Sequence, residues 1–242
     1  MDTDLTATGD LARYLPALLE RAGVKTVQMD VLTKGPSFKG GMVSTRAQEI
    51  TGAARDEHRL RNFGFWEYAL SAAIDTDPET RAGLIGGALR HSETSPDNMR
   101  MSLSEFTDSM RSQRFDKLPA RTIVSLTSSV DVDSNPASAW HLPLLDFGAP
   151  VSAAGQAACL DALQGLGMTG LLFNSGKSYH FYANQVLSER ENWKFLARAQ
   201  LLSPIVDARW ISHQILDGRA ALRISTDKER HEAPHRLAAV VD

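Results

Sequence analysis

Two acidic residues in the second half of the chain follow apolar runs, an arrangement suited to binding a cation. Asp146 follows the run at residues 142–145, and Asp207 follows the run at residues 204–206. A carboxylate at the end of a buried strand is held rigidly at the edge of a low-dielectric wall, and hard divalent cations prefer such oxygen ligands. Each acid also has a structural interpretation, since Asp146 suits a turn before Gly148 and Asp207 suits the N-cap of a helix.

A cationic, hydroxyl-rich segment lies between these two acids. Residues 175–178 read Ser-Gly-Lys-Ser and precede the alternating stretch Tyr-His-Phe-Tyr. The segment does not fit the phosphate-binding Walker loop, because the spacing from the preceding glycine is too long and the residues between are strand-like. As a turn between two strands, it brings Lys177, Ser178 and His180 together, and these side chains can bind a triphosphate. The alternative is that His180 packs against its strand neighbours.

The order of these parts resembles the catalytic domain of the archaeo-eukaryotic primase superfamily. This primase-polymerase fold also occurs in the polymerase domains of bacterial end-joining ligases. The family motifs are Asp-x-Asp, then Ser-x-His after a Ser-Gly turn, then a hydrophobic run that ends in an acid, and further on an arginine-bearing strand with a trailing proline. The matching segments are residues 144–148, 175–180, 205–207, 222–225 and 232–234, so that the resemblance covers roughly residues 122–241.

The resemblance implies an RRM-related sheet-and-helix module and a nucleotidyltransferase. It would use nucleoside triphosphates with Mg²⁺ or Mn²⁺, and its partners would be nucleotides and single-stranded or primed nucleic acid. The acceptor would be a nucleic-acid 3′ end or an initiating nucleotide. The implied catalytic residues are Asp146, His180 and Asp207, the implied metal ligands are Asp146 and Asp207, and the implied nucleotide-binding residues are Ser175, Lys177, Ser178, His180 and Arg223.

One departure from the family pattern leaves the activity open. Gly148 stands where the family has the second aspartate of its first motif. Two alternatives for the motif remain: the Asp-x-Asp at residues 131–133 is the true first motif, or one metal suffices, held by Asp146, Asp207 and the triphosphate. A weakened or inactive nucleotide-binding or nucleic-acid-binding subunit of a larger assembly is the alternative function. An unrelated α/β enzyme is a third interpretation, in which Asp146, His180 and Asp207 would not share a cleft.

Alternating helices and strands predict an α/β or α+β architecture. We expect a mainly helical portion at residues 1–120, which could contact protein partners, and a catalytic module at residues 121–242. Helices are predicted at residues 11–21, over most of 46–91, and at 102–114, 152–166, 188–201 and 207–216; strands are predicted at 26–32, 122–126, 141–147, 170–173, 179–182 and 220–224.

Composition excludes several classes of protein. The formal net charge of −3 gives no general attraction to nucleic acid, although residues 167–242 carry 10 basic and 8 acidic side chains. Cys159 is the single cysteine, so the chain has no internal disulfide and no multi-cysteine metal site. No run approaches the roughly 18 apolar residues of a membrane span, and the first residues are acidic, unlike a signal peptide. We therefore expect a cytoplasmic protein without a membrane segment.

Overall fold

The computed structural model describes residues 10–33, 44–61, 64–89, 97–119, 122–132, 140–225 and 235–242. The chain forms two compact units, residues 1–34 with 95–242 and residues 35–94, and each is described by itself. This grouping differs from the expected boundary at residue 120. The physical reason is that the early strands pair with strands of the second half, so they belong to the same unit.

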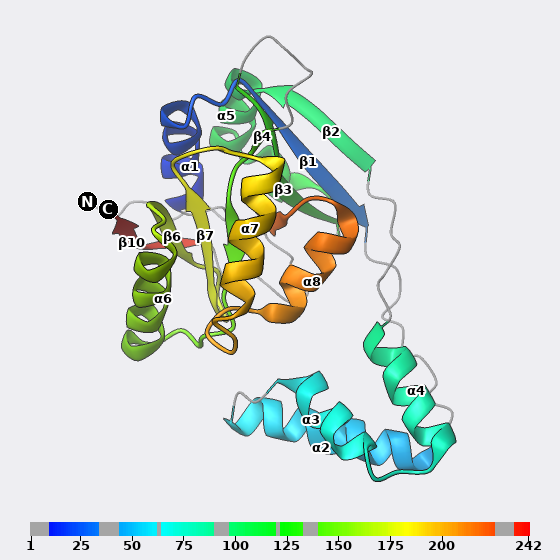
Figure 1. Ribbon diagram of the computed structural model, residues 1–242. Helices are drawn as coiled ribbons and strands as arrows, with labels where there is room; N and C mark the ends of the chain where they lie inside the picture. The colour runs from blue at the N-terminus through cyan, green and yellow to red at the C-terminus, as the bar shows by residue number, and fades with distance from the viewer. Residues whose placement is uncertain are drawn as a thin grey trace, which may run out of the picture. The chain divides into compact units, whose positions relative to one another are not determined.

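An antiparallel sheet, sheet A, joins the two halves of the larger unit. Its strand order is β2-β1-β3-β4-β8, and β9 also pairs with β3 (Figure 1). The strands are β1 (Thr26–Thr33), β2 (Asp97–Ser102), β3 (Thr122–Asp131), β4 (Trp140–His141), β8 (Leu187–Ser188) and β9 (Ala221–Arg223). Strand β2 was not predicted from the sequence, because only Met99 and Met101 mark its apolar face.

A second antiparallel sheet, sheet B, has the order β10-β6-β7-β5. Its strands are β5 (Leu144–Asp146), β6 (Gly170–Asn174), β7 (Tyr179–Ala183) and β10 (Arg236–Val241). The single strand predicted at residues 141–147 is wrong, since β4 belongs to sheet A and β5 to sheet B. Pro143 lies at the crossing and has no N–H to continue a ladder. Its carbonyl instead accepts a hydrogen bond of 3.0 Å from the Ala183 N–H.

Helices of the larger unit begin at the capping signals in the sequence. Ser102 and Glu105 form a capping box at the start of α5 (Leu103–Arg111), which ends before the predicted residue 114. Ser188 and Glu191 form another at the start of α7 (Glu189–Gln200). The remaining helices are α1 (Asp10–Arg21), α6 (Ala153–Leu166) and α8 (Ala208–Asp217), with a 3₁₀ turn, η1, at Arg114–Lys117.

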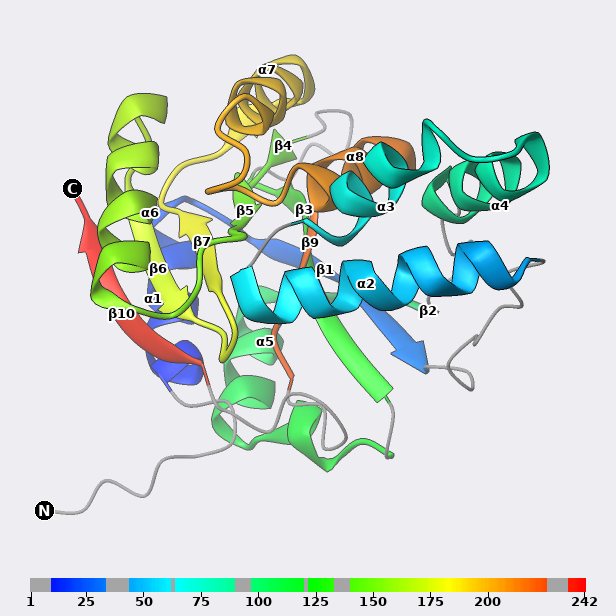
Figure 2. The same ribbon diagram turned by 90° about the horizontal axis from the view of Figure 1, so that it is seen from below.

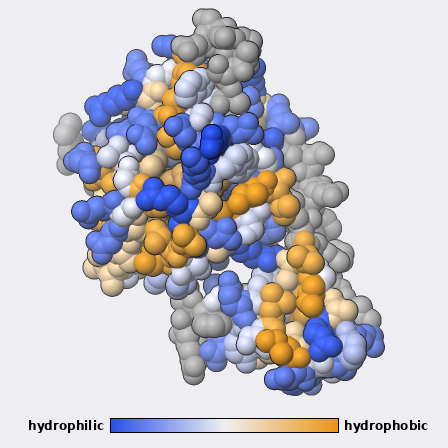
Figure 3. All heavy atoms as spheres, viewed as in Figure 1, coloured by the Kyte–Doolittle hydropathy of each residue, from blue (hydrophilic) through white to orange (hydrophobic). Residues whose placement is uncertain are grey.

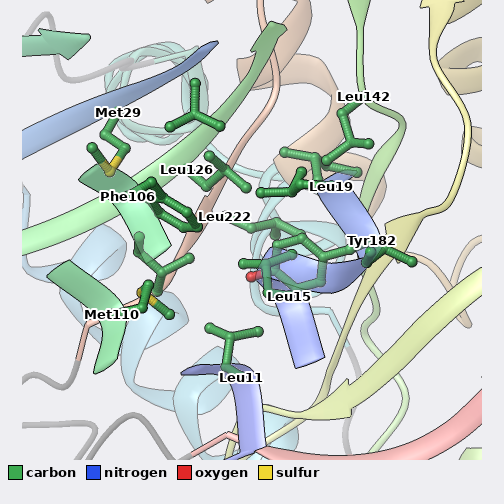
Figure 4. Close-up of a cluster of buried hydrophobic side chains, with 14 of the residues drawn as sticks. Leu11, Leu15, Leu19, Met29, Phe106, Met110, Leu126, Leu142, Tyr182 and Leu222 are labelled. Carbon is green, nitrogen blue, oxygen red and sulfur yellow. The ribbon is translucent and has the colours of Figure 1, made fainter. Parts of the chain in front are cut away.

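Two hydrophobic clusters cover the opposite faces of sheet B. The first packs Tyr182 and Leu144 against α1, α5 and the inner face of sheet A, as Figure 4 shows for part of the cluster. The second packs Leu145 and Phe181 against α6 and α7 (Figures 1 and 2). All five residues of β7 are therefore buried. The sheet has no solvent face along this strand, which fixes its register firmly.

The smaller unit consists of α2 (Thr45–Arg61), α3 (Phe65–Ala73) and α4 (Pro78–Leu89) among its described residues. Asp77 caps α4, since the Thr80 N–H donates to its carboxylate at 2.9 Å. The core of this unit is small and rich in alanine.

None of the helices in the described ranges is long and apolar enough to cross a membrane. Exposed apolar side chains occur on the larger unit. Figure 3 shows apolar surface over α8, where Ile215 and Leu216 are exposed.

Candidate functional site

Pairing between β5 and β7 brings Asp146 and His180 together. The two residues lie directly opposite each other in the antiparallel ladder, so their side chains share a face of sheet B. The His180 Nε2 atom lies 3.6 Å from Asp146 Oδ1. On the same face, Leu144 lies opposite Tyr182 in the first cluster. His180 and Tyr182 therefore lie on one side of β7, as alternation along a strand requires.

Backbone hydrogen bonds attach the end of β5 to the segment before α8. The Asp207 N–H donates to the Asp146 carbonyl at 3.1 Å, and the Gly148 N–H donates to the Ile205 carbonyl at 2.8 Å. Phe147 and Val206 form an isolated antiparallel bridge between them. Because main-chain atoms make these bonds, the two acids are neighbours whatever the charge of their side chains. Asp207 also has its structural role, since one carboxylate oxygen accepts the Trp210 N–H at 2.9 Å.

The Ser-Gly-Lys-Ser segment is a turn between β6 and β7, and no helix follows it. This confirms that it is not a Walker loop. The Ser175 N–H donates to the Ser178 carbonyl at 3.0 Å, and Gly176 takes a φ of +108°. Ser175 is buried and helps to close the turn, whereas Lys177 is exposed. Arg223 on β9 reaches this turn, and its Nη2 donates to the Ser175 carbonyl at 3.1 Å.

Burial and charge act together on Asp146. Burial away from solvent and, to a smaller extent, the neighbouring Asp207 carboxylate raise the pKa of Asp146 to about 8. The Arg223 charge and a hydrogen bond from the Ser178 hydroxyl act in the opposite direction. Asp207, Ser178 and Arg223 therefore all act on Asp146, which also lies beside His180. A raised carboxyl pKa of this kind is typical of functional sites.

Gly148 replaces the second aspartate of the family motif, and the local packing also requires a glycine at this position. A Cβ atom at this position would lie 2.8 Å from the Pro204 carbonyl oxygen, closer than real Cβ atoms approach backbone atoms. The close approach follows from the hydrogen bonds that attach residues 146–149 to the segment before α8. A second aspartate at position 148 would need a different backbone here.

Asp146 and Asp207 suit a single divalent cation. Asp146 Oδ1 is buried and accepts no hydrogen bond within the described ranges, and the adjacent carboxylate opposes its ionisation. A cation would relieve both unfavourable features. The described parts of the chain contain no group of three or more His, Cys, Asp or Glu side chains that could hold a metal ion.

The alternative first motif at residues 131–133 is engaged elsewhere. The Asp131 carboxylate forms an ion pair with Arg100 on β2, and its carbonyl accepts the Lys25 N–H at 2.7 Å. Asp133 lies outside the described residues, as does the trailing proline, Pro234. Cys159 is buried, and burial raises the pKa of its thiol to about 12.

One residue of the site, His235, was not expected from the sequence. Its Nε2 atom lies 3.3 Å from His180 Nδ1, and its side chain is buried. No local signal in the sequence marked it, because it directly precedes β10, a strand that was not predicted.

A family model described as archaeo-eukaryotic primase 1D-like matches residues 102–236, more than half of the 242 residues. No curated protein and no solved structure matches the chain. The matched range begins at the N-cap of α5 and ends at the first residue of β10, so it includes every residue of the site described above.

Proposed function

Because the chain belongs to the archaeo-eukaryotic primase-like family, we propose that it is a nucleotidyltransferase of the primase-polymerase type. Its substrates are nucleoside triphosphates and the 3′ hydroxyl of a nucleic acid or of an initiating nucleotide. Transfer joins the 3′ oxygen to the α-phosphorus and releases pyrophosphate. The observation that carries the proposal is the convergence of Asp146, Asp207, His180 and Arg223, which come from four separate segments.

Each side chain has a role that follows from its chemistry. Asp146 and Asp207 would hold Mg²⁺ or Mn²⁺, which supplies Lewis-acid stabilisation of charge on phosphate oxygens. His180 donates from Nε2, the ring nitrogen on the Asp146 side, to a phosphate oxygen. Arg223 contributes a fixed positive charge, since its guanidinium is oriented by the Ser175 carbonyl. Ser178 and Lys177 add a hydroxyl and an ammonium group at the turn.

The proposal is tested by incubating the full chain with labelled nucleoside triphosphates, Mn²⁺ and a primed or unprimed single-stranded template. We expect product from the natural protein and none from Asp146→Asn or Asp207→Asn. Asp161→Asn, an exposed acid on α6, is the matched control and retains activity. Asp131→Asn tests the alternative first motif, and it also retains activity if Asp146 is the true ligand. Product that survives Asp146→Asn contradicts the proposal.

A second candidate function is nucleotide binding without transfer, within a larger assembly. The closed Cβ position of Gly148 favours it, because a carboxylate at this position, the third of a two-metal centre, would have no space on the present backbone. The same incubation separates the two functions. The binding function is supported if the natural protein forms no product on any template but binds a nonhydrolysable nucleotide tightly. This binding should be lost in Asp146→Asn.

A further inference from the structure

His235 forms a buried pair with His180 at the edge of the site. Its side chain is only 1% exposed, and its Nε2 atom lies 3.3 Å from His180 Nδ1. The ring centroids are 5.2 Å apart and the planes are inclined by 47°, so the two rings meet obliquely through their nitrogens. The pair joins the start of β10 to the middle of β7, two strands that are not neighbours in sheet B.

Contacts with α1 and β6 hold the carbonyl of His235 and the two residues that follow it. The Asp10 N–H at the start of α1 donates to the His235 carbonyl at 2.9 Å, and the Leu237 N–H donates to the Asp10 carboxylate at 2.9 Å. The next residue, Arg236, pairs with Asn174 in the ladder with β6. Since the main chain is fixed in this way, the imidazole of His235 has little freedom to move away from His180.

The two ring nitrogens of His180 face different groups. Nε2 lies on the side of Asp146, and Nδ1 lies on the side of His235. A neutral imidazole carries its proton on one nitrogen, and a hydrogen bond at one nitrogen decides the state of the other. If the His235 Nε2–H donates to Nδ1, the His180 proton stays on Nε2, on the side of Asp146.

We propose that His235 is a positioning residue: its Nε2–H donates to His180 Nδ1 and fixes the orientation and tautomer of His180, so that the Nε2–H is presented to a phosphate group. The phosphate part of this inference rests on the proposed function above. The tautomer part does not, since it concerns two rings of the free protein.

The tautomer is measured on the full chain labelled with ¹⁵N-histidine, without nucleotide. We expect the His180 proton on Nε2, an unprotonated Nδ1, and a ¹⁵N–¹⁵N coupling across the hydrogen bond to His235 Nε2. A proton on Nδ1 of His180, or no coupling between the rings, overturns the proposal. This measurement needs no substitution, so it stands even if a variant fails to fold.

Substitutions then test the effect on the nucleotide. His235→Phe fills the same space without a donor, and we expect about tenfold weaker binding of a nonhydrolysable nucleoside triphosphate with Mn²⁺, the loss of one hydrogen bond to a charged group. His235→Gln retains an amide N–H and restores most of the affinity. His58→Phe, an exposed histidine of α2, is the control and leaves binding unchanged.

The pattern among the variants separates positioning from packing. If His235 only fills space, His235→Phe binds as well as the natural protein and His235→Gln binds worse, which overturns the proposal. If the natural protein binds no nucleotide at all, the proposed function fails, whereas the coupling between the two rings still decides the positioning role.

Discussion

Replacement of Gly148 tests whether this glycine is a lost carboxylate or a packing requirement. The family pattern has an aspartate here, so Gly148→Asp restores the motif in the sequence. In the structure, however, the new Cβ would lie 2.8 Å from the Pro204 carbonyl oxygen. Both atoms belong to segments joined by main-chain hydrogen bonds, so neither can move without weakening the attachment of Asp146 to Asp207. We expect the substitution to damage the site that it was meant to complete.

The size of the effect follows from the contact. Forcing one extra carbon into a closed space costs about 1–3 kcal/mol of unfolding free energy. Gly148→Ala measures this steric cost alone. Gly148→Asp adds a third carboxylate beside Asp146, whose pKa is already raised to about 8 by burial and by Asp207. In the absence of metal, the unfolding free energy of Gly148→Asp should therefore fall at least as much as that of Gly148→Ala.

The assay is denaturant unfolding in the presence of a chelator, followed by Mn²⁺ titration and the transfer assay. Gly165→Ala is the matched control, because a Cβ at this position of α6 meets no atom within 4 Å. We expect that control to gain about 0.4–1 kcal/mol, since alanine restricts the unfolded chain. If Gly148→Asp unfolds at the same denaturant concentration as the natural protein and binds Mn²⁺ more tightly, the steric argument is refuted.

Three further predictions concern charged side chains. Asp146→Asn should stabilise the metal-free protein at pH 8 and have no effect near pH 4, because the folded-state pKa is raised from 3.8 to about 8 and the cost of ionising the group appears only as pH rises. That shift sets an upper limit of about 6 kcal/mol on the gain in unfolding free energy. Because 23% of the Asp146 side chain is exposed, we expect a gain on the order of 2 kcal/mol, measured by unfolding experiments at several pH values. Asp207→Ala should lose about 1 kcal/mol more than Asp207→Asn in urea unfolding, because asparagine can still cap α8 through the Trp210 N–H; equal losses would contradict the capping role. Arg219→Met should lower the unfolding free energy by about 1–3 kcal/mol, since it leaves the nearly buried Asp30 without its 2.8 Å partner, and the double variant with Asp30→Asn should recover part of the loss.

Local signals in the sequence predicted most helices of the larger unit. Capping residues at Ser102, Ser188 and Asp207 each occur where a helix begins, because a side-chain acceptor is needed for the first free N–H groups wherever the helix lies in the fold. The same local logic predicted the turn at residues 175–178. Such signals depend on a few neighbouring residues, so they can be read without the tertiary structure.

Pairing between distant strands could not be predicted in this way. The apolar run at residues 141–147 looks like one strand, yet the chain changes sheets at Pro143. Strand β10 has neither a turn signal nor regular alternation, and it forms because β6 offers it a partner. The contribution of His235 depends on that pairing and on Asp10 at the other end of the chain, so no local pattern could have identified it.

The environment of Asp146 is unfavourable for stability in the metal-free protein, and this argues for a role in binding. Leu144 and Leu145 on the same strand already fill the two cores, so β5 needs no acid for its packing. Asp146 nevertheless has one buried oxygen that accepts no hydrogen bond within the described ranges, and a second carboxylate is attached beside it by main-chain bonds. A fold optimised for stability alone would place a neutral or apolar side chain there. The unfavourable charge supports the proposal that a cation completes the site.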